Sequence, residues 1–281
     1  MRASGILLPV SSLPSKYGIG CFSAEAYEFV DQLARAGQKY WQILPLGPTG
    51  YGDSPYQSFS TFAGNPYFID LEAFVKAGCL DESDCENCDW GGSESYVDYE
   101  KIYNSRFRLL RKAFENYDCE GDLSYQKFIN ENAAWLEDYS LYMAIKDSLN
   151  GISWIEWPKE LKNREKDALA EAREKLTKEV GFYCFQQYWF FKQWTELKTY
   201  AMRKAWRSSE MYRSTLRLTV RMHGHSRNCS SLTRIIFRLG LPDARRMLFP
   251  LPGSSGEIRF MTGSTIRRPV MHGGHAGWPT V

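Results

Sequence analysis

Residues 5–46 read GILLPVSSLPSKYGIGCFSAEAYEFVDQLARAGQKYWQILPL, and this stretch decides the fold class. Two short apolar runs, residues 5–11 and 40–46, lie at its ends between turn-forming residues, as is typical of buried strands. Between them apolar side chains recur at helical spacing, and Gly37 follows as a helix stop. A strand, a helix and a strand in about forty residues predict a βαβ unit, and therefore a parallel sheet in an α/β fold.

The chain beyond this unit predicts one more short strand and then a mostly helical region. A loop rich in Gly, Ser and Tyr, residues 48–66, precedes a short strand at residues 67–70, which leads into a helix beginning near Leu71. Residues 80–98 are acidic and rich in turn formers, and we expect a surface excursion there. Residues 99–201 have helical periodicity, and the aromatic helix that ends this region, residues 182–201, is predicted to be buried.

The main functional signal is the loop segment YGDSPYQS, residues 51–58. Its tyrosine rings offer flat apolar faces to the C–H side of a sugar, and Asp53, Ser54 and Gln57 offer hydrogen bonds to hydroxyl groups. The loop follows the carboxyl end of a parallel strand, where α/β sheets and barrels place their sites. The alternative is a well-packed Ω-loop whose tyrosines are buried.

A metal site is the weaker candidate. Cys85 and Cys88 have the spacing of zinc ligands, and Cys79 and Cys119 are not far away in the sequence. A structural zinc site needs four ligands, and no second Cys-x-x-Cys pair or local histidine supplies the rest. We therefore predict free surface thiols and no metal.

The remaining sequence features exclude several classes of protein. No glycine-rich phosphate-binding loop is present, so no cofactor is predicted. No apolar run has the length of a bilayer span, and the N-terminus does not resemble a secretory signal. Seven cysteines, an odd number, then indicate reduced thiols. We expect a cytoplasmic protein without membrane partners, and the sequence leaves its oligomeric state open.

The net charge of +2 is the sum of two different regions. Residues 1–200 carry 21 Lys+Arg and 30 Asp+Glu, whereas residues 201–281 carry 14 Lys+Arg and 3 Asp+Glu. Arginine outnumbers lysine 13 to 1 in the second region, which also holds all four histidines. A basic tail can bind nucleic-acid phosphates, but these arginines do not line one helical face.

Three strings together resemble a known family. They are GILLPVSSLPSKYGIG at residues 5–20, YWQILPLGPTGYGDSPYQSFSTFAGNPYFIDLE at residues 40–72 and FFKQWTELKTYA at residues 190–201. They are similar to the N-terminal part of bacterial 4-α-glucanotransferases, the amylomaltase or disproportionating-enzyme family. The resemblance covers residues 1–201.

The resemblance implies an enzyme that moves α-1,4-glucan segments between maltooligosaccharides by a retaining double displacement. It also implies a (β/α)₈ TIM barrel with inserted subdomains, which this chain would form only in part. The expected division of the chain is first barrel strands and glucan-binding loop in residues 1–78, a mainly helical insertion in 79–180, a barrel helix in 181–201 and a tail in 202–281.

The same resemblance implies roles for single residues. Ser54 and Tyr56 would contact sugar at the cleft and Tyr51 at a secondary glucan site, and the chemistry of the loop adds Asp53. The family's nucleophile, acid/base and third carboxylate lie in later barrel strands, so no residue here is assigned a catalytic role. We therefore expect this chain to be inactive; the alternative is a non-catalytic glucan-binding fragment.

After Ala201 the resemblance stops. The family continues with a turn NEKG and a strand similar to IIGDVPIYV, whereas residues 202–216 read MRKAWRSSEMYRSTL. Reading these codons one base earlier permits NEKGVEIIGDVPIYV. The same shift permits two further family strings, CQKDAFSATGQLWGNP at residues 243–258 and GYAWW at residues 269–274. We predict that one base was lost near codon 201, so that residues 202–281 are out-of-frame translation, are not natively folded and are no nucleic-acid-binding tail.

This prediction is tested by sequencing the gene across codons 198–206. We expect one base fewer than the family reading frame requires. An intact frame in that interval would contradict the hypothesis.

Overall fold

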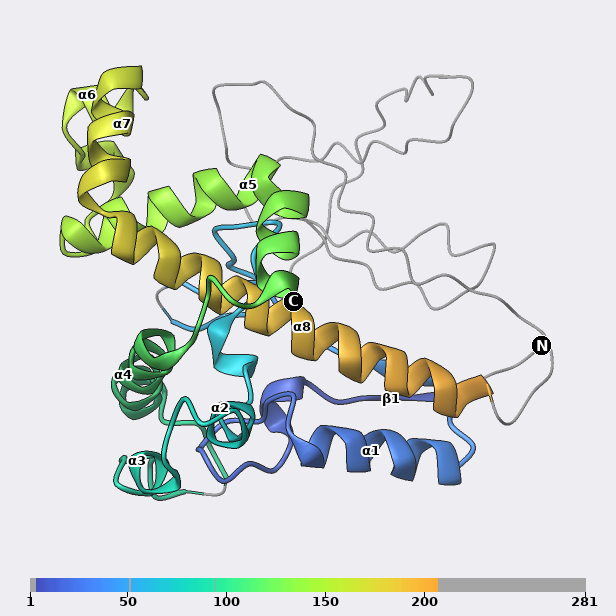
Figure 1. Cartoon of the computed structure of the whole chain (residues 1–281). Helices are drawn as coiled ribbons and strands as arrows, with labels where there is room; N and C mark the ends of the chain where they lie inside the picture. Colours follow the sequence, from blue (N-terminus) through green and yellow to red (C-terminus); the bar gives the residue numbers. More distant parts are fainter. Residues whose placement is uncertain (1–3, 51, 94, 207–281) are drawn as a thin grey trace, which may run out of the picture. The chain divides into compact units, whose positions relative to one another are not determined.

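The computed structural model describes residues 4–50, 52–93 and 95–206. This part is mostly helical, with two short strands close to the N-terminus (Figure 1). No helix within the described ranges is long and apolar enough to cross a membrane.

The predicted βαβ unit is confirmed. Strand β1 (Gly5–Leu7) pairs in parallel with β2 (Tyr40–Gln42), and α1 (Ala24–Arg35) connects them. Ile6 lies beside Trp41 in the register of the two strands.

Both strands are shorter than expected. One further hydrogen bond, from Leu8 N–H to the Gln42 carbonyl (3.0 Å), extends the ladder, and pairing then ends. Pro9 follows β1 and Pro45 follows β2. Because proline has no N–H to donate, neither strand continues the ladder through its proline.

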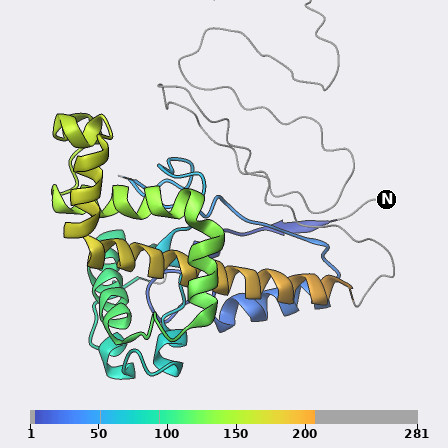
Figure 2. The same ribbon diagram turned by 45° about the horizontal axis from the view of Figure 1, so that its top comes forward.

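Helix α8 (Thr177–Trp206) runs beside α1 in both views (Figures 1 and 2). Two contacts join these helices, Tyr27 with Tyr200 (ring centroids 5.0 Å) and Asp31 with Lys204 (2.7 Å). Phe22, just before α1, contacts Phe190 (5.3 Å), so the three contacts have the same order along both segments. The two helices are therefore parallel. Parallel neighbouring helices are what successive βα units produce.

The helical region predicted for residues 99–201 is confirmed. It contains α4 (Tyr99–Asn116), α5 (Leu123–Ser148), α6 (Lys159–Lys162) and α7 (Lys166–Lys175) before α8. The aromatic helix is buried, as expected, although it begins at Thr177 rather than near residue 182. Its buried rings are Phe182, Tyr183, Phe185, Tyr188, Trp189 and Phe190.

The strand predicted at residues 67–70 is wrong, because this segment contains a 3-10 turn, Pro66–Phe68. The Asn65 side chain accepts a hydrogen bond from Tyr67 N–H (3.0 Å), and Pro66 occupies the first position of the turn, where no donor is needed. The expected helix after it is present as α2 (Glu72–Lys76).

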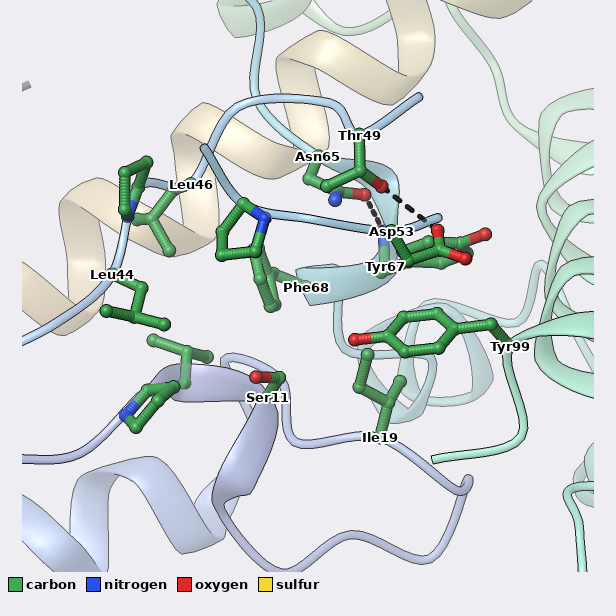
Figure 3. Close-up of a pocket in the computed structure, with 14 residues that line it drawn as sticks. Ser11, Ile19, Leu44, Leu46, Thr49, Asp53, Asn65, Tyr67, Phe68 and Tyr99 are labelled. Atoms are coloured by element: carbon green, nitrogen blue, oxygen red, sulfur yellow. Dashed lines mark hydrogen bonds between the residues drawn. The ribbon is translucent and has the colours of Figure 1, made fainter. Parts of the chain in front are cut away.

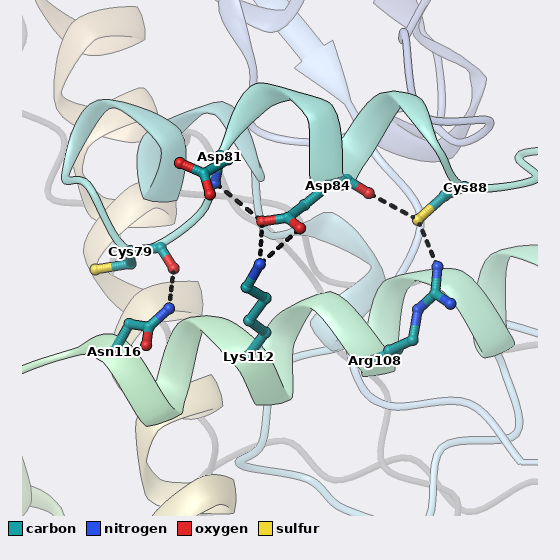
Figure 4. A network of polar contacts seen from close by, with 7 residues as sticks. All are labelled: Cys79, Asp81, Asp84, Cys88, Arg108, Lys112 and Asn116. Carbon is teal, nitrogen blue, oxygen red and sulfur yellow. Dashed lines mark hydrogen bonds and ion pairs between the residues drawn. The ribbon is translucent and has the colours of Figure 1, made fainter.

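The acidic segment, residues 80–98, is not purely a surface excursion. It contains α3 (Glu82–Glu86), which begins with a capping box. An ion pair between Asp84 and Lys112 of α4 (2.6 Å) holds α3 against α4 (Figure 4). The expectation of surface thiols is wrong for Cys79 and Cys85, which are buried in the apolar core. Within α3, Cys85 faces the apolar core, whereas Asp84 faces Lys112 of α4.

Asp122 joins three helices. As the N-cap of α5 it accepts hydrogen bonds from the N–H groups of Ser124 (2.7 Å) and Tyr125 (3.2 Å). Its other oxygen accepts from the hydroxyl of Tyr117, just after α4, and from that of Tyr188 on α8 (2.8 Å). Burial opposes ionisation of this carboxyl, but the two tyrosine bonds and the N-cap bonds outweigh it and lower the pKa of Asp122 to about 2.

Replacing this carboxylate should cost stability in a pH-dependent way. Asp122→Ala is expected to lower the free energy of unfolding by about 2–4 kcal/mol at pH 7, because it removes a cap and leaves two hydroxyl groups without their charged acceptor. A depressed native pKa stabilises above the unfolded value and loses this effect as pH falls through the native value, so the difference should shrink between about pH 4 and pH 2.

Urea unfolding at pH 7 and pH 2.5 measures the effect. Asp118→Ala is the matched control, because Asp118 lies nearby and accepts only an exposed turn bond from Gly121 N–H (2.8 Å). Equal losses of stability in the two variants would contradict the role assigned to Asp122.

Candidate functional site

The loop over residues 48–66 is closed at its base. Asn65 N–H donates a hydrogen bond to the Leu46 carbonyl (2.8 Å), and this bond joins the segment that enters the loop to the segment that leaves it. A little further out, Thr49 and Ser58 form an antiparallel bridge. Because these contacts bring its two ends together, the segment is an Ω-loop that begins a few residues after β2.

Asp53 is fixed at a sharp turn within this loop. Its φ is +50°, a left-handed conformation that aspartate adopts more readily than most residues, and Gly52 before it also has a positive φ of +86°. Asp53 N–H donates to the Gly50 carbonyl (3.1 Å), and the Thr49 hydroxyl donates to the Asp53 carboxylate (3.2 Å). The carboxylate is therefore held in one direction.

That direction is into a small cavity of about 30 Å³ beneath the loop. Asp53 shares this cavity with the rings of Tyr67 and Tyr99, which come from the segment after the loop and from the start of α4 (Figure 3). The cavity has room for about two water molecules and is too small for a sugar ring.

The three groups influence one another's protonation. Burial raises the pKa of Asp53, and the Thr49 hydrogen bond opposes this shift. Burial also raises the pKa of Tyr67 and of Tyr99, and the nearby Asp53 charge raises both further. Both phenols therefore keep their protons at neutral pH and remain hydroxyl donors.

The structure separates the residues predicted to contact sugar. Tyr51 lies outside the described residues. Ser54 is half-buried in a turn, where its carbonyl accepts a hydrogen bond from Gln57 N–H (3.0 Å). Tyr56 is 63% exposed, so the alternative of a packed loop with buried tyrosines is wrong for this ring. Of the described site residues only Asp53 lines the cavity; Ser54 and Tyr56 lie outside it.

Tyr67 and Tyr99 were not among the residues predicted from the sequence to form the site. Tyr67 could have been found, because it belongs to the same loop string, GNPY, that carries the family resemblance. Tyr99 gives no comparable signal. Its position beside Asp53 depends on how the acidic segment folds, which the sequence pattern does not show.

Helix α5 supports the outer part of the loop. The rings of Phe62 and Trp135 are stacked at a centroid distance of 5.8 Å, with an angle of 17° between their planes. The Lys146 ammonium lies 5.1 Å from the centre of the Phe59 ring, in a cation–π contact. The loop is thus held by the helical region as well as by its own base.

The cysteine cluster is arranged for packing. Cys88 Sγ receives a hydrogen bond from Arg108 (3.2 Å) and lies 3.2 Å from the Asp84 carbonyl, as Figure 4 shows. No group of three His, Cys, Asp or Glu side chains in the described part of the chain is placed to hold a metal ion.

The comparisons with known proteins agree on one family. The family model described as 4-alpha-glucanotransferase matches residues 8–207. A 4-alpha-glucanotransferase of Clostridium butyricum is 50% identical over 195 residues, which cover 69% of this chain and 40% of that protein. The Thermus thermophilus enzyme of the same name is 45% identical over 204 residues, covering 71% of this chain and 40% of the relative.

A solved structure agrees with these sequence matches. An amylomaltase from Streptococcus agalactiae, in complex with acarbose, superimposes with a TM-score of 0.70 at 41% identity, over 73% of this chain and 42% of that one. The chain thus spans about two fifths of the length of the relatives that it matches. Because the family model covers more than half of the chain, from just after β1 to the end of α8, the chain belongs to the 4-alpha-glucanotransferase family.

Proposed function

We propose that residues 4–206 form the glucan-binding N-terminal part of a 4-α-glucanotransferase. The parent activity is the transfer of α-1,4-glucan segments between maltooligosaccharides with retention of configuration. The observation that carries the proposal is an exposed aromatic ring, Tyr56, on a loop whose base is closed and whose polar groups are held in place. The relative solved with acarbose supports it.

The loop has the groups that sugar recognition requires. An exposed tyrosine ring stacks against the apolar C–H face of a glucose unit, and its hydroxyl remains free to bond at the edge. Ser54 and Asp53 lie within three residues of this ring and supply hydrogen-bonding groups for sugar hydroxyls. The contribution of such a loop to catalysis is to hold the glucan in the correct position, since binding energy away from the reacting bond is used for orientation.

The chemistry itself needs a different set of residues. Retaining transfer uses two carboxyl groups about 5–5.5 Å apart, one as nucleophile and one as acid/base. Among the residues that line the described cavity, Asp53 is the single carboxylate, so this cavity holds no such pair. We therefore propose that this chain binds glucan and does not transfer it.

The out-of-frame reading of residues 202–281 belongs to the same proposal. It accounts for the change from a lysine-containing acidic region to an arginine-rich basic one after residue 200, a few residues before the family match ends at residue 207. It also removes the need for a nucleic-acid partner. The expectation that residues 202–281 are not natively folded is wrong for residues 202–206, which continue α8. Residues 207–281 lie outside the described part of the chain.

The activity is tested by glucose release from maltotriose. We expect the 281-residue chain to release no glucose above the background of a heat-treated sample. A gene with one base restored near codon 201 should give a longer product and measurable release. Turnover by the 281-residue chain would show that the proposal of inactivity is wrong.

Binding is tested separately by calorimetric titration with maltotetraose. Tyr56→Ala should weaken binding by about tenfold, because stacking of a sugar on an exposed ring contributes on the order of 1 kcal/mol or more. Tyr96→Ala is the matched control, since Tyr96 is also exposed (69%) but lies on the acidic segment. A similar loss of affinity in both variants would argue against a site on the loop.

A further inference from the structure

Two glutamines of α8 bind the polypeptide backbone in the same unusual way. Gln187 accepts a hydrogen bond from Gly64 N–H (2.7 Å) and donates one to the Gly64 carbonyl (3.0 Å). Gln193 does the same with Asp70, at 2.7 Å and 3.1 Å. Each side-chain amide thus replaces the neighbouring strand that a segment in a sheet would have.

The two clamped residues differ in position relative to the loop. Gly64 is the residue before Asn65, whose N–H closes the loop base on Leu46 and whose side chain caps Tyr67. Asp70 lies beyond the loop, next to α2. A displacement at Gly64 is therefore passed directly to the loop base and to Tyr67, whereas one at Asp70 is not.

Packing leaves little freedom at the first clamp. Gln187 is fully buried, and a Cβ placed on Gly64 would lie 2.1 Å from the Phe190 ring. Gly64 therefore fits against α8 only because it has no side chain. A buried amide held at two points, with a ring against the backbone, defines the position of Gly64 closely.

We propose that Gln187 is a positioning residue for the glucan-binding loop. Its amide holds Gly64, and through Asn65 it sets the distance between Asp53 in the loop and Tyr67 just after it. This inference rests on the proposed function for the identity of the ligand. The holding of the loop itself can be tested without any ligand.

The experiment compares Gln187→Met with Gln193→Met in the full 281-residue chain. Both variants keep the length of the side chain and remove the two hydrogen bonds of one buried glutamine, so their effects on global stability should be similar. Hydrogen exchange is measured for the amides of residues 52–63, and binding of maltotetraose by calorimetry. Urea unfolding corrects both readouts for global stability.

We expect exchange in the loop to be about tenfold faster in Gln187→Met, because local opening no longer breaks the two clamp bonds. Maltotetraose affinity should fall by a similar factor, and saturating maltotetraose should restore protection of the loop. Gln193→Met should leave loop exchange and affinity close to wild type. If Gln187→Met does not fold, Gln187→Glu is compared with Gln193→Glu instead. Loop exchange is again expected to be faster, and maltotetraose affinity lower, in the Gln187 variant.

Two results would overturn the inference: equal loosening of the loop in both variants, or normal loop exchange in Gln187→Met. A wild-type chain that binds no maltotetraose would instead overturn the proposed function. Faster loop exchange in Gln187→Met would in that case still support the positioning role, so the two failures are distinguishable.

Discussion

The burial of α8 on several sides is the constraint on which the rest of the described structure depends. Its aromatic side chains contact α1 through Tyr200, α4 through Phe185 and α5 through Tyr188. A helix with apolar side chains on more than one face must be covered by other elements, because each exposed ring would cost free energy in water. Helices α1, α4 and α5 provide this cover, and the βαβ unit and the helical excursion are thereby joined.

Helix α8 also supplies hydrogen-bond partners to the backbone at the candidate site. The sheet ends after Gln42, and the chain between there and Asp70 has no neighbouring strand beyond a single bridge in the described structure. Buried backbone groups in such a segment still need partners. Gln187 and Gln193 supply them from α8, so the loop owes its position to a helix more than a hundred residues later in the chain.

The βαβ unit and the helical region could be predicted from the sequence, because both depend on local periodicity. Gly37, with a positive φ of +68°, follows the end of α1 as expected. The Tyr67 segment could not, because its conformation depends on the Asn65 cap and on amides from α8, which are distant in sequence. The candidate loop was found from its residue types, but its partner Tyr99 was missed. The burial of Cys85 was missed for a similar reason, since an acidic segment usually indicates a surface.

The central claim is that glucan binds on the loop over residues 48–66 that α8 holds in place. The most direct test is a map of backbone amide chemical shifts in the full, isotope-labelled chain during titration with maltotetraose. The account predicts that the largest changes lie within residues 52–58, with smaller changes at Asn65 and Tyr67. Changes confined to residues 99–206, or none at saturating sugar, would contradict it.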